Sequence, residues 1–231
     1  MRFMILHRSN AHWETGASPS PELIARVGQL IGDLIKANAL LAGEGLRPSS
    51  HGVRLQFTNG RRTVTDGPFT ESKELLAGFA IMRTASLQEA VDWATKFAQV
   101  FGTDLEIDIR PVTEPWDIGM AHEPAGLTTR RYMATHKHRY IDGCRPLSPA
   151  QAAAMGALVE EMKRAGVLLS AEGLQPSAQG ARIMSVGVFK VIKSVYQARF
   201  AGGSNRVTIA HPQHVSMGAA VQEQQAGERG Q

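Results

Sequence analysis

A carboxylate at a tight turn is the first candidate for chemistry in this sequence. Asp66 begins the tetrapeptide Asp66-Gly67-Pro68-Phe69. At the rim of a pocket, this carboxylate would act as a general base or bind an amine or hydroxyl of a ligand, with Gly67, Pro68 and Phe69 as neighbouring contacts. Asp-Gly-Pro is also ordinary turn chemistry, in which the carboxylate accepts hydrogen bonds from backbone amides. Both interpretations stay open for Asp66, and Phe69 also suits an anchor in the core.

A histidine in the first predicted strand is the natural partner for this carboxylate. Residues 3–7 are largely apolar and end at His7. A strand that points into a barrel would place His7 beside Asp66 and form an acid/base pair; the alternative is a polar residue at a strand end. Lys73 and Glu74 follow the turn and would line the same pocket, unless they belong to a solvated charged stretch.

The remaining candidates lead us to expect no metal and no cofactor. His136 and His138 alternate in the sequence and would share one face of a strand, but two histidines do not complete a site. Cys144 is the single cysteine, so an intramolecular disulfide and a cysteine-based metal site are both excluded. We interpret Cys144 as a loop residue rather than a nucleophile.

The basic residues also predict no nucleic-acid site. The formal charge is +4, and no Asp or Glu occurs between Gly173 and Gln222. Phe189, Tyr196 and Phe200 lie in this basic stretch and could stack bases, but charge and aromatics alone do not define an interface. Three arginines of a predicted hairpin are expected to be exposed rather than to bind an anion: Arg54, Arg61 and Arg62.

The elements that would position these residues occur twice. The segment from Leu41 to Arg54 recurs from Leu169 to Arg182, at an offset of 128 residues. Ser-Pro pairs match at the same offset, and residues 3–7 match 132–136 at an offset of 129. Shared glycine and proline positions in one order predict a tandem duplication.

The first copy shows a clear order of elements. The patterns predict a strand over 3–7, a helix from 21 to about 41, strands over 53–57, 62–65 and 78–82, a helix over 86–101 and a strand over 105–112. Asn59-Gly60 predicts a two-residue hairpin. This is an α+β, ferredoxin-like βαββαβ pattern with an extra hairpin strand, duplicated in tandem. Because such a sheet has helices on one face only, we expect an intrachain pseudo-dimer or a homodimer to cover the other face.

Three spaced motifs resemble the YCII-related family, and more closely its DGPF-domain branch. They are Gly43-Glu44-Gly45-Leu46 with Pro48, the run from Val64 to Leu75 that contains the tetrapeptide, and Gly78-Phe79. The resemblance implies a dimeric α/β-barrel of ferredoxin-like type. It also implies an activity that depends on a His and an Asp, and for some members an association with sigma factors. Only Asp66 carries over, because residues 21–26 at the start of the first helix contain no His.

The second copy departs from this pattern after residue 184. We therefore predict a complete domain at 1–119, a linker at 120–129, the first half of a second copy at 130–184, and a diverged or frame-shifted segment at 185–231 that is partly disordered. The abrupt loss of acidic residues is what a reading-frame shift would produce, and ordinary divergence is the alternative.

Composition sets the broad class. The chain has 231 residues, of which 43% are hydrophobic and 20% charged, and it has no apolar run long enough to span a bilayer. We expect a cytoplasmic protein without membrane contacts. Two functions stay open: binding or acid/base transformation of a small organic molecule in a cavity near Asp66, or a non-catalytic regulatory or interaction module, with a sigma factor among the partners that the resemblance implies. A ligand-sized cavity at Asp66 would favour the first, and a solid core with an exposed apolar surface would favour the second.

Overall fold

The computed structural model describes residues 2–7, 9–69, 76–102, 104–138 and 146–179. The helices are α1 (Ala11–Glu14), α2 (Pro21–Lys36), α3 (Leu87–Phe101) and α4 (Pro149–Arg164). The strands are β1 (Gly45–Leu46), β2 (Val53–Thr58), β3 (Arg61–Asp66), β4 (Gly78–Thr84), β5 (Leu105–Thr113), β6 (Arg130–His138) and β7 (Leu168–Gly173). Lys73, Glu74 and the predicted segment 185–231 lie outside the described residues. Among the described helices, none has the length and apolar character needed to cross a membrane.

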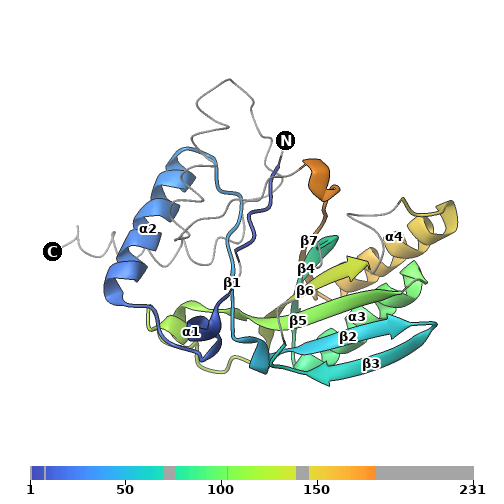
Figure 1. Cartoon of the computed structure of the whole chain (residues 1–231), viewed down its shortest axis with the longest axis horizontal. Coiled ribbons are helices and arrows are strands. Elements are labelled where there is room, and N and C mark those ends of the chain that lie inside the picture. Colours follow the sequence, from blue (N-terminus) through green and yellow to red (C-terminus); the bar gives the residue numbers. More distant parts are fainter. Residues whose placement is uncertain (1, 8, 70–75, 103, 139–145, 180–231) are drawn as a thin grey trace.

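One antiparallel sheet organises the fold. Its strands run in the order β3-β2-β5-β6-β4-β7, and β1 pairs with the end of β5. Helices α3 and α4 lie side by side on one face of the sheet (Figure 1). This α+β architecture is compatible with the predicted ferredoxin-like class.

The hydrophobic core lies between this face of the sheet and the two helices. Alternate residues of each strand point toward the helices, because successive side chains of a strand lie on opposite faces. The sheet contributes fully or almost fully buried side chains: Leu55, Met82, Ile107 and Ile109. The helices complete the core chiefly with small or aromatic residues of α3 and with two residues of α4: Ala90, Val91, Ala94, Ala98, Phe101, Leu158 and Met162.

Several local predictions are confirmed. Asn59 and Gly60 connect β2 to β3 with φ values of 50° and 74°, which is the backbone that a two-residue hairpin with matched twist requires. Ser86 caps α3 by accepting a hydrogen bond from the Glu89 amide at 3.1 Å. Helix α3 then ends at Gly102, whose φ of 60° is left-handed.

The strand predicted over residues 3–7 is wrong. These residues form no strand, and Phe3, Ile5 and Leu6 are exposed. The central position that this strand would take, between β4 and β5, is held by β6, which pairs with both neighbours along its length. The residues of the predicted second copy that match 3–7, residues 132–136, thus form a central strand of the sheet.

Helix α2 carries an apolar face that is half-buried and does not belong to the hydrophobic core. Ser20 caps the helix as predicted, accepting a hydrogen bond from the Leu23 amide at 3.2 Å. The helix ends at Lys36, earlier than the predicted Leu41, because Asn38 adopts a left-handed φ of 50°. None of the residues of α2 is buried, and α2 stands apart from the sheet and from α4 (Figure 1).

Candidate functional site

The Asp66-Phe69 turn is fixed to the 3-10 turn at Ser49–His51. The Gly67 amide donates a hydrogen bond to the Gly52 carbonyl oxygen at 3.1 Å, and the Phe69 amide donates to the Ser49 hydroxyl at 3.1 Å. A Cβ atom on Gly67 would lie 1.8 Å from the backbone carbonyl oxygen of Ser49. Only glycine therefore fits at this position, because the backbone atoms it faces cannot move aside.

Glu14 anchors this turn from the N-terminal side. Its carboxylate accepts hydrogen bonds from the Ser49 amide at 2.8 Å and from the Ser49 hydroxyl at 2.6 Å. Burial opposes ionisation of Glu14, but the hydrogen bonds from Ser49 and Ser9 and the charge of Arg110 outweigh it, so the pKa of Glu14 is lowered. A chain of hydrogen bonds thus runs from Glu14 through Ser49 to the backbone of Phe69.

The two predicted catalytic residues are both exposed. Asp66 is the last residue of β3, and His7 lies in the N-terminal segment outside the sheet. Within the part of the chain that the structure describes, no hydrogen bond or ion pair joins His7 to Asp66. The acid/base pair and the contacts of Gly67 and Pro68 with a ligand stay predictions.

A charged cluster lies on the sheet face opposite α3 and α4. It consists of Arg54 and Gln56 of β2, Glu106 and Asp108 of β5, and Lys137 of β6. Arg54 donates two hydrogen bonds to Asp108, at 2.7 Å and 2.9 Å. Lys137 binds Glu106 at 2.5 Å and Asp108 at 3.4 Å, and Gln56 donates to Glu106 at 3.0 Å. Its two cations and two carboxylates balance, and all four carboxylate oxygens take part in these contacts.

This cluster brings one of the predicted residues into a buried polar setting. The guanidinium carbon of Arg54 lies 4.8 Å from the centre of the Phe69 ring, which is a favourable cation–π distance. Phe69 itself is half-buried. The lysine side chain of the cluster, Lys137, is only 4% exposed. Burying these charges is costly unless each is paired, so the contacts fix the register of β2, β5 and β6.

A second polar contact lies where β1, the end of β5 and the start of β6 meet. Arg131 of β6 donates two hydrogen bonds to Glu114, both at 2.7 Å, and one to Glu44 at 2.8 Å. Burial of Arg131 favours its neutral form, but the two carboxylates outweigh burial and raise its pKa. Arg2 makes a two-pronged ion pair with Glu172, in which the second distance is 2.9 Å.

Two histidines of β6 lie inside the core. The ring of His136 packs 5.0 Å from Phe97 and 5.8 Å from Phe101, and the ring of His138 lies 5.2 Å from Phe101. Burial, helped by the nearby His138, lowers the pKa of His136 to about 4. Among the described residues, no group of three or more potential ligands gathers as a metal site.

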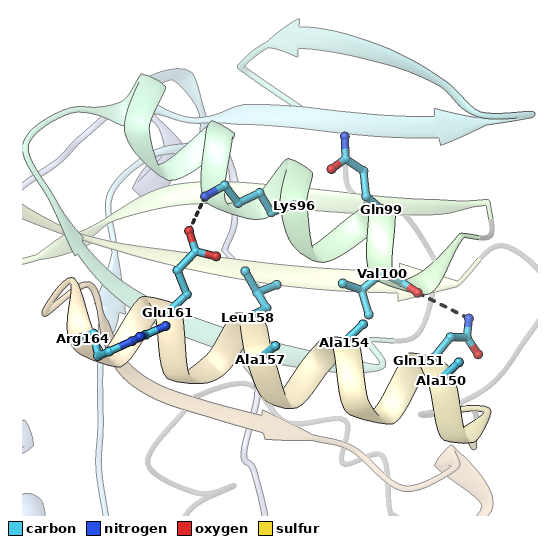
Figure 2. A pocket seen from close by; sticks show the side chains of 10 residues that line it. All are labelled: Lys96, Gln99, Val100, Ala150, Gln151, Ala154, Ala157, Leu158, Glu161 and Arg164. Atoms are coloured by element: carbon cyan, nitrogen blue, oxygen red, sulfur yellow. Dashed lines mark hydrogen bonds and ion pairs between the residues drawn. The ribbon is translucent and has the colours of Figure 1, made fainter.

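Neither of two hollows on the described surface is lined by Asp66 or His7. The larger is an open groove between α3 and α4, in which small side chains of α4 such as Ala154 face Val100 of α3 (Figure 2). Lys96 binds Glu161 across one end of this groove at 2.7 Å (Figure 2). The smaller hollow, of about 70 Å³, lies beside Glu106 and Lys137. It is too small for an organic ligand of ordinary size.

The first half of the chain is similar to known proteins. Residues 1–113 match the YCII-related domain. A stretch of 67 residues is 36% identical to an uncharacterised protein of Rhizobium meliloti (strain 1021). This stretch covers 29% of this chain and 54% of that protein. The chain thus spans about half the length of this relative. No solved structure matches the chain.

The sequence prediction missed the charged cluster. Its signal was present in the alternation of Glu106, Asp108 and Arg110 with apolar residues within the predicted strand over 105–112. The partners come from β2 and β6, which are distant in sequence, so only the strand register could reveal them.

Proposed function

We propose that this protein is an interaction module whose binding surface is formed by residues 2–7 and helix α2. The observation that carries the proposal is the contrast between two similar helices. Helix α4 buries Leu158 and Met162 against the core, whereas α2 has leucines at the matching positions, Leu30 and Leu34, and buries neither. The apolar face of α2 is thus half-buried where that of α4 is buried, and an amphipathic helix with an incompletely buried apolar face is suited to bind a further surface.

The wider pattern supports this function over catalysis. Asp66 lines neither of the two hollows described above, and Phe3, Ile5 and Leu6 form exposed apolar surface. We interpret the chain as a tandem member of the DGPF-type branch, in which the second copy kept its first half and diverged after residue 184. We propose a second copy of this chain or a sigma factor as the partner.

The test is self-association. We expect the sedimentation coefficient of the wild type to rise with protein concentration, because α2 offers an apolar face that another molecule covers. Leu30→Asp should abolish the rise, whereas Ala25→Asp, on an exposed position of the same helix, should leave it unchanged. A chain that sediments as a monomer at every concentration, or equal effects of the two variants, would contradict self-association through α2.

A second function rests on the exposed carboxylate of Asp66. This residue stands next to the turn that Glu14 and Ser49 hold in place, so its position is rigid while its carboxylate faces no partner among the described residues. We propose, as the second candidate, that Asp66 binds a small organic molecule. A thermal-shift screen of wild type and Asp66→Asn against organic acids, phenols and metal ions tests it, because a bound ligand raises the melting temperature. Ligands that stabilise both proteins equally would count against Asp66.

A further inference from the structure

Most of the sheet and its two helices are built from two segments of the chain, and the helix of a third segment with a similar sequence lies apart from them. We call residues 78–113, which form β4, α3 and β5, the central half. Residues 130–174, the repeat half, are docked on it: β6 lies between β4 and β5, α4 packs on α3, and β7 pairs with β4. Residues 2–46, the N-terminal half, match the repeat half in sequence and contain α2 and β1, but residues 3–7 form no strand.

The two outer halves make equivalent contacts with one another. Arg131, near the start of the repeat half, binds Glu44 near the end of the N-terminal half. Arg2 binds Glu172 in the same way. At offsets of 129 and 128 residues, Arg2 matches Arg131 and Glu44 matches Glu172. Each half therefore contacts the other through matching residues, although the Arg2–Glu172 pair is exposed and the Arg131–Glu44 pair is nearly buried. Of the two matching helices, α4 of the repeat half packs on α3, whereas α2 does not.

The N-terminal half carries the side chains that docking uses. In the docked helix α4, Leu158 and Met162 are buried and Glu161 binds Lys96 of α3 at 2.7 Å. The matching residues of α2 are Leu30, Leu34 and Asp33, which keep two apolar groups and the carboxylate. Both helices are followed by a left-handed residue at the same position, Asn38 with φ 50° and Gly166 with φ 67°. The family match supports the pairing, because residues 1–113 unite the N-terminal and central halves in one domain.

The N-terminal half is also the more apolar of the two. On the docked strand β6, Tyr132 and Ala134 face the helices, and the matching residues are Phe3 and Ile5. Docking of the N-terminal half would place Ile5 where Ala134 lies, and Leu30 and Leu34 where Leu158 and Met162 lie. It would therefore bury apolar side chains of comparable or larger size in the same positions, so the exchange keeps the core filled.

We propose that the N-terminal half docks on the central half of a second copy of this chain, in the place that the repeat half holds here. This rests on the proposed function of α2 as a binding surface. The partner is a second copy because, within its own chain, Gly45 and Leu46 at the end of the N-terminal half pair with the end of β5, while α2 stands apart from α3 (Figure 1).

A cross-linking experiment tests the exchange directly. All variants carry Cys144→Ser, so that no other cysteine is present. A chain with Asp33→Cys is mixed with a chain with Lys96→Cys and treated with a short bis-maleimide, and peptide mass spectrometry identifies the linked positions. Both residues are exposed or half-exposed, so the variants should fold. We expect a covalent dimer that joins position 33 of one copy to position 96 of the other.

Two controls make the result decisive. A single chain with Lys96→Cys and Glu161→Cys should cross-link within itself, as the ion pair requires. A chain with Ala25→Cys in place of Asp33→Cys should give only background, because the matching Ala153 of α4 is exposed and does not line the groove against α3. If positions 33 and 96 do not link above this background, the exchange is overturned. A link found only when both changes are in one molecule would overturn it too.

The same samples separate the exchange from the proposed function. If Leu30→Asp abolishes self-association while positions 33 and 96 never link, α2 is a binding surface but its partner is not the central half. If the wild type does not self-associate and no link forms, both proposals fail.

Discussion

Buried His136 makes the stability of this fold depend on pH in a calculable way. The pKa of His136 falls from its ordinary value of 6.5 to about 4, because the ring is buried against Phe97 and Phe101 and lies near His138. The unfolded chain therefore takes up a proton near pH 6.5 that the folded chain takes up only near pH 4. Stability from the neutral ring is fully present above pH 6.5 and is lost as the pH falls toward 4.

The size of this effect follows from the shift. One pKa unit corresponds to about 1.4 kcal/mol, so the full difference is on the order of 3 kcal/mol in the free energy of unfolding. Urea denaturation at several pH values between 4.5 and 7.5 measures it. We expect the wild type to lose stability across this range and His136→Leu, which has no proton to gain, to lose markedly less.

The control for this experiment is the matching histidine of the first copy. His7→Leu changes an exposed side chain outside the sheet, so the dependence of stability on pH should stay that of the wild type. If His136→Leu keeps the full slope between pH 6.5 and 4.5, the ring is not buried in its neutral form and the packing of β6 against α3 is wrong.

Three further predictions concern stability measured by urea denaturation. Gly67→Ala should lower the free energy of unfolding by on the order of 3 kcal/mol, because its Cβ would meet a backbone oxygen at 1.8 Å, whereas Gly32→Ala has open space in α2 and should raise it by about 1 kcal/mol. Arg131→Met should cost about 3–5 kcal/mol, since it removes the cation that two nearly buried carboxylates share; an unchanged midpoint would show that these carboxylates reach solvent. Leu158→Ala should cost about 2–4 kcal/mol, and Leu30→Ala at the matching position of α2 should cost much less. Equal losses for the two leucines would mean that α2 is covered.

Local structure could be predicted wherever neighbouring residues determine it. The hairpin at Asn59-Gly60 and the capped helix after Ser86 follow from residues that act on their own backbone, and both formed where expected. The α+β class followed from the order of these elements. The site was harder, because the polar partners of Arg54 and Lys137 lie on strands distant in sequence, and their meeting depends on strand register.

The wrong strand at residues 3–7 has a different cause. Residues 3–7 and 132–136 have the same pattern and suit the same position between β4 and β5, so local preference cannot choose between them. The choice depends on the total packing of each half, including Arg131 with its two carboxylates and α4 against α3. Because the chain contains a repeat, the tertiary packing of the two copies, rather than local propensity, decides whether 3–7 or 132–136 forms the strand.

The chain has two segments that can dock on its single central half, which is a reason to expect a partner. The described residues provide one central half, β4-α3-β5, and two strand-helix-strand sequences that suit it. Any assembly made from these parts alone leaves one such sequence per chain without a central half, whichever of the two is docked. Exchange between copies therefore does not remove the exposed surface but changes its character, from the leucine-rich α2 to the alanine-rich α4. The half that is docked would then determine which partner the protein can bind. The property to measure is therefore the fraction of chains in which the N-terminal half, rather than the repeat half, is docked.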